Sequence, residues 1–296
     1  MKNPMHFALA AAAVLASGGA MAQATDTLAK IQSSGTAVMG VRESSPPLSY
    51  LLGAGKYVGY HVQLCEQVLA AVAPKVAIRH MPVTSQNRIP LLQNGTIDIE
   101  CGSTTNNAAR KQQVDFALTT YVTEARLAVK TASGIQRVEQ LQGRNVVTTT
   151  GTTLVQRLRK LDRLGIAFNV MYAKDHAESF LMLESGRADA FAMDDNTLAG
   201  NIASARNPRD FSIVGEPLGV EPISIMLRKD DARFKAAVDG ELRRMIASGE
   251  LARAYDRWFM QPIAPTGAVI NIPMAKSLRE ALARPNDDPA EAYEGK

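Results

Sequence analysis

Three clusters of small polar residues follow predicted strands of this 296-residue chain. They occupy residues 103–110, residues 148–153, and the pair Asp194 and Asp195. Each cluster taken alone is typical of a turn or a helix cap, where Ser, Thr, Asn and Asp are preferred. All three, however, stand just past the carboxyl ends of strands, where open α/β sheets place their ligand crevices. The pattern therefore indicates a small-molecule site assembled from separate loops.

A catalytic use of these residues must also be considered. Ser103, His176 and Asp194 contain the residue types of a nucleophilic triad. The chain has no G-x-S-x-G elbow, no H-E-x-x-H pair and no G-x-x-x-x-G-K-[ST] loop. We therefore predict a site that binds without catalysing a reaction, so that the protein is not an enzyme and uses no cofactor and no metal ion.

Strands and helices that alternate along the chain must position the polar clusters. Apolar residues recur at helical spacing between the strands, as in Leu154, Leu158 and Leu161. Strands are predicted at residues 37–41, 76–83, 97–101, 145–148, 188–193 and 222–227. This alternation favours an α/β fold with largely parallel sheets covered by helices. The same order of elements restarts near residue 145, which indicates two similar lobes.

The N-terminus has the pattern of a cleavable export signal. Lys2 precedes an apolar run at residues 7–16, and small residues end at Ala22. A membrane span needs about 20 continuous apolar residues, and Ser17 interrupts this run too early. We therefore expect residues 1–22 to be removed and the mature protein to start at Gln23, in the periplasm. The rest is longer than one compact core usually holds, which agrees with two lobes.

Composition and cysteine content restrict the partners. The formal net charge is +4, but Lys and Arg are dispersed among acidic residues. Nucleic acid is therefore not an expected partner. The two cysteines are Cys65, in a predicted helix, and Cys101, in a predicted strand. An oxidising compartment permits a bridge between them, but two buried thiols remain an equal alternative.

Several segments carry a resemblance to a known family. They are residues 40–45, 84–95, 100–107, 173–176, 183–187, 193–195 and 227–231. Through them the chain resembles the glutamate/aspartate-binding proteins of bacterial ATP-binding-cassette amino-acid transporters, within the type II periplasmic solute-binding proteins. The resemblance covers roughly residues 30 to 285, and residues 84–107 are specific to the acidic-amino-acid branch.

The resemblance implies a two-lobe fold that closes over its ligand. Each lobe is expected to be a mostly parallel sheet flanked by helices, with two hinge strands near residues 119–127 and 215–224. The expected ranges are 23–123 for the start of the first lobe, 124–219 for the second lobe and 220–283 for the return to the first lobe. Residues 284–296, rich in Pro, Asp and Glu, are expected to form a mobile tail.

The resemblance also assigns a role to each candidate site residue. Arg110 and Thr105 are expected to hold the α-carboxylate of an amino acid. Asp194 and Ser103 are expected to receive its ammonium group, although spacing does not separate Asp194 from Asp195. The other expected residues are Arg42, Ser85, Arg88 and His176 at the side-chain carboxylate, and Thr153 as a donor from the second lobe.

The function that the resemblance implies is capture of glutamate or aspartate and delivery to the permease subunits of the transporter. We expect a monomer. A sensor for a membrane receptor and a periplasmic enzyme of the dehydratase kind are alternatives on the same fold, because a fold does not determine function.

Overall fold

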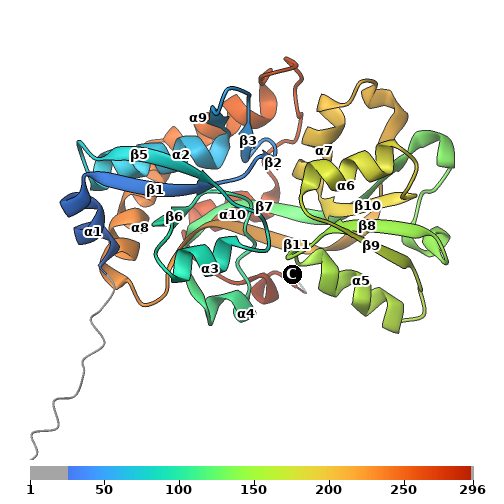
Figure 1. The fold of residues 1–296 in the computed structure, drawn as a ribbon, viewed down its shortest axis with the longest axis horizontal. Coiled ribbons are helices and arrows are strands. Elements are labelled where there is room, and N and C mark those ends of the chain that lie inside the picture. Colours follow the sequence, from blue (N-terminus) through green and yellow to red (C-terminus); the bar gives the residue numbers. More distant parts are fainter. Residues whose placement is uncertain (1–25, 295–296) are drawn as a thin grey trace, which may run out of the picture.

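The structure is a computed structural model that describes residues 26–294. The predicted export signal at residues 1–22 therefore lies outside the described residues. The described chain is an α/β protein whose main sheet has eight strands in the order β5-β1-β6-β11-β7-β10-β8-β9. Figure 1 shows this sheet running through the whole length of the molecule, with helices on both sides. A small sheet, β2-β3-β4, lies beside it.

The first part of the chain builds a parallel sheet with covering helices. β1 pairs in parallel with both β5 and β6. Polar caps begin two of the helices: Asp26 accepts from the backbone of Ala29 at the start of α1, and Asn107 accepts from that of Arg110 at the start of α4. The bounds are α1 Thr27–Ser34, β1 Thr36–Val41, β2 Ser44–Ser45, β3 Ser49–Leu51, β4 Tyr57–Val58, α2 Tyr60–Val72, β5 Ala77–Pro82, α3 Arg88–Gln93, β6 Ile99–Glu100 and α4 Ala108–Lys111.

Two long strands, β7 (Val114–Lys130) and β11 (Phe211–Arg228), connect the two halves of the molecule. They pair antiparallel along their length, with register shifts such as the one between Val214 and Gly219. At one end β11 pairs with β6, and at the other β7 pairs with β10. Because each strand contributes to both halves, bending of this pair would change the angle between them.

The middle of the chain forms the second half, again from strand–helix units. β8 pairs in parallel with β9 and β10, while β10 pairs antiparallel with β7. Three short 3-10 helices lie in this part of the chain, two between β7 and β8 and one between α7 and β11. The bounds are η1 Thr131–Ser133, η2 Val138–Leu141, β8 Asn145–Thr149, α5 Leu154–Arg163, β9 Asn169–Ala173, α6 His176–Glu184, β10 Ala190–Asp194, α7 Asp195–Ser204 and η3 Pro208–Asp210.

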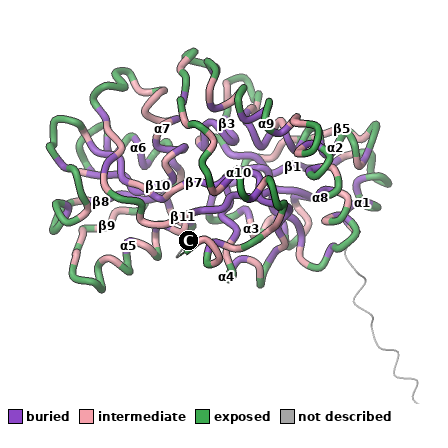
Figure 2. The backbone as a smooth tube through the Cα atoms, turned by 180° about the vertical axis from the view of Figure 1, so that it is seen from behind, coloured by how far each residue is buried: buried purple, intermediate pink, exposed green. Residues whose placement is uncertain are grey.

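Each half has its own hydrophobic core. One cluster of buried side chains includes Leu64, Phe234 and Phe259, and the other includes Phe191 and Leu158. Figure 2 shows the buried strands running inside both halves, with the exposed backbone on the outer helices and loops. We call the first body the first lobe and the body around β8, β9 and β10 the second lobe. A smaller cluster around Phe116 belongs to the first lobe.

The C-terminal part returns to the first lobe, and one prediction about it is wrong. Residues 284–296 were predicted to be a mobile tail, but the described part of this segment packs on the first lobe: the Asn286 carbonyl accepts from the Thr119 amide at 2.8 Å. The acids that suggested disorder have partners, since Asp287 pairs with two lysines. The bounds are α8 Ala232–Ala247, α9 Glu250–Tyr255, η4 Asp256–Met260, α10 Lys276–Ala283 and η5 Ala290–Ala292.

The structure settles the open question of the two cysteines. Cys65 of α2 and Cys101, which follows β6, form a disulfide. The bridge ties a covering helix to the strand end from which the polar residues 103–110 continue, so it restrains one side of the predicted site.

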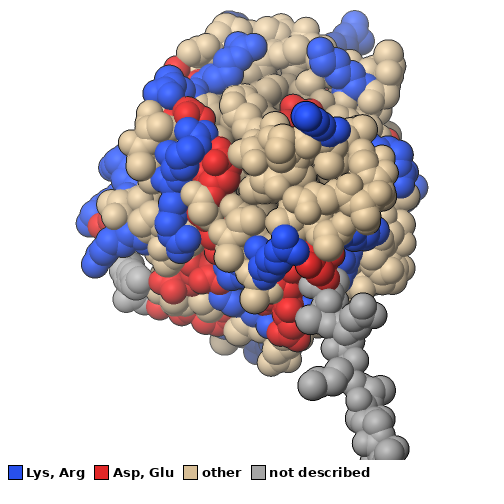
Figure 3. All heavy atoms as spheres, turned by 90° about the vertical axis from the view of Figure 1, so that its left-hand side faces the viewer, with Lys and Arg blue, Asp and Glu red and all other residues tan. Residues whose placement is uncertain are grey.

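Charge is distributed as the sequence suggested. On the face shown in Figure 3, Lys and Arg are interspersed with Asp and Glu. Within residues 26–294, no helix has both the length and the apolar character to cross a membrane.

Candidate functional site

The predicted site residues come together between the two lobes. The first lobe supplies Arg42 after β1, Ser85 after β5, Arg88 of α3, Ser103 and Thr105 after β6, and Arg110 of α4. The second lobe supplies Thr153 before α5, His176 at the start of α6, and Asp194 at the end of β10. All of them are buried except Thr153, which is half-buried.

Arg42 lies at the centre of one group of these residues. Its side chain is 1% exposed. One Nη donates to Ser103 Oγ at 3.2 Å, and the other donates to Ser85 Oγ at 2.9 Å. The second Nη also lies 3.3 Å from His176 Nε2 of the other lobe. The Arg42 guanidinium thus contacts three other predicted residues. Ser45, which sequence reasoning did not single out, extends this group by accepting from Ser103 Oγ.

The hydrogen bonds behind His176 determine which ring nitrogen carries its proton. Ser179 Oγ donates to the Asp175 carbonyl, so the Thr149 hydroxyl donates to Ser179 and accepts from Nδ1 of His176 at 2.8 Å. Nε2 then has a free lone pair and accepts from Arg42. Burial, followed by the neighbouring arginine cations, lowers the pKa of His176 well below its ordinary value. The neutral ring therefore supports Arg42 rather than presenting a proton of its own.

Arg88 and Arg110 complete a group of three buried arginines. Arg88 donates to the Ser103 carbonyl at 3.2 Å, and its Nε has no partner among the described residues. Arg110 donates to the Thr105 carbonyl at 2.9 Å and, across the lobes, to the Gly151 carbonyl at 3.1 Å. Neither guanidinium has an ion pair within 4.0 Å in the described chain, where only carbonyls receive its protons.

Burial changes the pKa of all three guanidinium groups. Burial, followed by the Arg88 cation, lowers the pKa of Arg42 to about 9 and that of Arg110 to about 10, although neighbouring carboxylates such as Glu100 and Asp194 oppose the change. The pKa of Arg88 is also lowered by burial. Such groups favour an anionic partner strongly, because a buried charge is costly unless it is paired.

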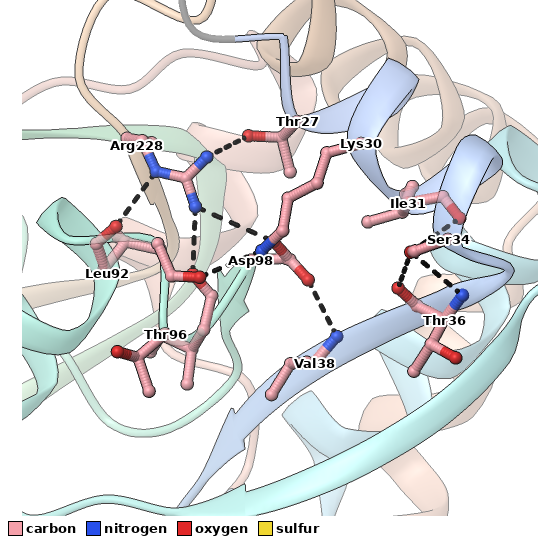
Figure 4. Close-up of polar contacts among 12 residues, drawn as sticks. Thr27, Lys30, Ile31, Ser34, Thr36, Val38, Leu92, Thr96, Asp98 and Arg228 are labelled. Atoms are coloured by element: carbon pink, nitrogen blue, oxygen red, sulfur yellow. Dashed lines mark hydrogen bonds and ion pairs between the residues drawn. The ribbon is translucent and has the colours of Figure 1, made fainter.

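Arg228, an arginine of the same lobe outside the site, differs from the three site arginines in its hydrogen-bond partners. Its guanidinium donates to the Leu92 carbonyl at 3.0 Å, Thr27 Oγ1 at 2.8 Å and the Ile97 carbonyl at 3.1 Å, and it lies 3.7 Å from Asp98. Figure 4 shows this closed network, in which the Asp98 carboxylate also accepts from the Val38 amide. Arg228 thus has protein partners all around it, whereas the three site arginines retain unused capacity for an anion.

Asp194 is a buried acid of the site with an oxygen that is unpartnered in the described chain. It is 1% exposed, and its Oδ1 has no partner among the described residues. Burial, then Glu221 and Asp195, raise the pKa of Asp194 well above its ordinary value, while Arg88 and Arg110 oppose this rise. Asp195 differs because its carboxylate accepts from Thr123 Oγ1. The geometry thus favours Asp194 as the acceptor for a cationic group.

The two lobes are closed on one another in this structure. Arg42 reaches His176, and Arg110 reaches Gly151. Gly151 has φ +82°, and a Cβ atom there would lie 2.7 Å from the Ser85 carbonyl oxygen. Only glycine allows the second lobe to approach so closely.

Sequence reasoning missed Thr149, Ser45 and Glu221. Thr149 and Ser45 lie within segments that had been noted, so their neighbourhood was a usable signal. Glu221 is fully buried on β11, where its Oε1 accepts from Arg157 Nε at 2.8 Å and its Oε2 has no partner among the described residues. Its position directly before the apolar residues of the predicted strand 222–227 was the only sequence signal for it.

Asp194 is buried and its pKa is raised in this closed structure. We predict that opening of the lobes exposes it and restores the ordinary pKa, so that closure of the ligand-free protein takes up a proton. Closure should therefore be favoured at low pH and become less favourable as the pH rises above about 4, the ordinary value for Asp. Asp194→Asn should remove this dependence and increase the closed-to-open ratio at pH 7 by about tenfold per unit of pKa shift.

Small-angle X-ray scattering on ligand-free protein tests this prediction. The radius of gyration should decrease from pH 7 to pH 5 for the natural chain and be small at both values for Asp194→Asn. Asp162→Asn, which changes an exposed carboxylate on α5, is the control. An Asp194→Asn variant that stays open at pH 7 would contradict the prediction.

Comparisons with known proteins agree with this geometry. Residues 37–261 match the family model of bacterial extracellular solute-binding proteins, family 3. The chain is 45% identical over 289 residues to the L-glutamate/L-aspartate-binding protein of Pseudomonas aeruginosa, covering 95% of each chain. It is 42% identical to the glutamate/aspartate import solute-binding protein of Escherichia coli, covering 92% of this chain and 95% of that one.

Solved structures show the same fold. An ancestral arginine-binding protein bound to arginine superposes with a TM-score of 0.70 and 28% identity, covering 76% of this chain and 98% of that chain. A mutant ArgBP from T. maritima has a TM-score of 0.73 and 26% identity, covering 79% of this chain and all of that chain.

Proposed function

Because the chain belongs to the bacterial extracellular solute-binding proteins of family 3, we propose that it captures glutamate and aspartate for an ATP-binding-cassette importer. By their names, one relative is an L-glutamate/L-aspartate-binding protein and two are glutamate/aspartate import solute-binding proteins. It is a transport-associated binding protein and not an enzyme.

The observation that carries the proposal is the balance of charge between the lobes. An acidic amino acid has two carboxylates and one ammonium group. Among the described residues, the site holds three buried guanidinium groups with no ion pair within 4.0 Å and the buried Asp194 carboxylate, whose Oδ1 has no partner. Two further buried carboxylates, Glu100 and Glu221, lie near the arginines and balance part of their charge. A guanidinium matches a carboxylate through parallel hydrogen bonds, so the donors and acceptors of ligand and site are complementary.

The same balance argues against neutral or basic ligands. Glutamine would leave two buried arginines without a full countercharge, and arginine would add a third cation beside them. Leaving a buried charge unpaired costs several kcal/mol in typical proteins. We therefore expect selection of acids although the solved structures of similar fold include arginine-binding proteins.

We assign the residues to three ends of the ligand. Arg110 and Thr105 hold the α-carboxylate, and Asp194 with Ser103 receives the ammonium. Arg42, Ser85 and Arg88 bind the side-chain carboxylate, with His176 positioning Arg42. Thr153, which borders the same cavity as Arg110, contributes from the second lobe.

Capture is proposed to occur by closure of the lobes about β7 and β11. We keep the boundaries 23–123, 124–219 and 220–283 for the first lobe, second lobe and return. The ligand stabilises the closed form because only that form brings Arg110 and Asp194 to it together. Permease subunits then recognise the closed shape. We further propose export to the periplasm, cleavage after Ala22, and action as a monomer.

Calorimetry on refolded, ligand-free mature protein tests the function. Glutamate and aspartate should bind at least 100-fold more tightly than glutamine and asparagine, since the difference of several kcal/mol corresponds to that ratio. Tight binding of a neutral or basic amino acid with no binding of either acid would refute the proposal.

A further inference from the structure

The C-terminal residues 286–294, here called the strap, lie directly on the loop that carries Thr105 and Arg110. Asn106 Nδ2 donates to the carbonyls of Asp287 and Asp288 at 2.9 and 3.3 Å. The amide of Ala290 donates to the Asn106 carbonyl at 2.9 Å. The strap therefore forms hydrogen bonds with both the side chain and the backbone of Asn106, a fully buried loop residue next to Thr105.

The strap also fixes the short helix that presents Arg110. Glu291 Oε2 accepts from the Ala108 amide at 3.0 Å, at the first residue of α4. Asp287 accepts from Lys111 Nζ through its carbonyl at 2.8 Å and its carboxylate at 3.0 Å. A helix of four residues has no stability of its own, so its position depends on such partners.

The strap then extends to the second lobe. Glu294 Oε1 lies 3.4 Å from Arg157 Nη1 of α5. Arg157 is held against β11, because it also donates to Glu221 and to the Leu218 carbonyl. A Cβ atom at Gly219 would lie 1.9 Å from Arg157 Nη1, so this glycine makes room for the guanidinium.

Strap and site share one cavity between the lobes. A cavity of about 410 Å³ is lined by Arg110 and Thr153 of the proposed site, by Arg157 and Glu221, and by Glu291 and Glu294 of the strap. The strap thus forms one wall of the space that leads to Arg110.

We propose that the strap is a positioning element of the ligand site. Resting on the proposed function, it sets the loop so that Thr105 and Arg110 face the α-carboxylate, and its Glu294 helps to retain the closed form through Arg157. Its loss affects the end of the ligand that all amino acids share, and not the side-chain end at Arg42 and Arg88.

The test uses full-length mature variants. Asp287→Ala combined with Glu291→Ala should weaken the binding of glutamate and of glutamine by about tenfold each, because hydrogen bonds to charged groups are removed. The ratio of the two dissociation constants should stay unchanged. Glu280→Ala, an exposed acid on α10 that pairs with Lys276, is the matched control and should bind as the natural chain does. Unchanged affinity of the double variant, or loss for glutamate alone, would overturn the proposal.

Two further measurements separate positioning from a general effect on folding. Glu294→Gln should speed glutamate dissociation several-fold in stopped-flow experiments while the ligand-free melting temperature stays within the range of the Glu280→Ala control. An unchanged dissociation rate would refute the role of Glu294.

Hydrogen exchange gives a readout that needs no ligand. The amides of residues 106–111 should exchange faster in the double variant, while those of α2 should not change. Equal exchange in residues 106–111 would overturn the strap proposal even if glutamate binds. If the natural chain does not bind glutamate, the proposed function fails, and the exchange result still decides whether the strap holds the loop.

Discussion

Arg110→Ala is expected to weaken binding of glutamate, aspartate and glutamine alike, by about 100-fold or more. Arg110 is buried at the junction of the lobes, and within residues 26–294 its guanidinium donates only to the carbonyls of Thr105 and Gly151. In our proposal it holds the α-carboxylate, which all three ligands share. Removing one partner of a buried charge pair costs about 2–5 kcal/mol, and 1.4 kcal/mol corresponds to tenfold.

Calorimetry with the three ligands checks this result. Arg159→Ala is the matched control, because Arg159 is exposed on α5 and the substitution makes the same change in net charge. Arg110→Lys should recover only part of the affinity, since an ammonium cannot offer two parallel donors to a carboxylate. A loss confined to the acidic ligands would show that Arg110 binds the side-chain end instead.

Arg88→Ala is expected to remove most of the preference for acids. Arg88 is 2% exposed, and its Nε has no partner in the described chain. Glutamate should lose about 100-fold in affinity when this cation is absent, by the cost of truncating one member of a buried pair. Glutamine should change by only a few-fold, because its amide needs no countercharge.

The ratio of the two dissociation constants is the quantity to measure. Arg79→Ala, which removes an exposed arginine from β5 in the same lobe, should leave the ratio unchanged. Equal losses for glutamate and glutamine in Arg88→Ala would mean that Arg88 positions the loop through the Ser103 carbonyl and does not select the ligand.

Much of the fold could be predicted because its signals are local. The strand at residues 76–83 appears as β5, Ala77–Pro82, and the helix after His176 appears as α6, His176–Glu184. Strand 222–227 was predicted too short, because β11 continues to Phe211 and crosses into the second lobe. The stretch around Glu216 gives no alternating pattern, and β11 is recognised as one strand through its pairing with β7 up to Val214 and again from Gly219.

The states of individual side chains could not be predicted in the same way. Spacing did not separate Asp194 from Asp195, and only the family resemblance favoured Asp194. The structural distinction is that the Asp195 carboxylate accepts a hydrogen bond from Thr123 of β7. The disulfide could not be predicted from the sequence either, since Cys65 and Cys101 lie 36 positions apart and only the packing of α2 brings them together.

The sequence by itself determined which residue types stand at the strand ends, and hence that an α/β crevice rich in arginine and hydroxyl groups would form. Tertiary structure decided which of these groups are already satisfied. Arg228 is surrounded by carbonyls and Asp98, whereas Arg42, Arg88 and Arg110 are buried together with no ion pair within 4.0 Å among the described residues. The physical reason is that hydrogen-bond satisfaction and desolvation depend on neighbours that are distant in the chain, such as the strap beside Asn106.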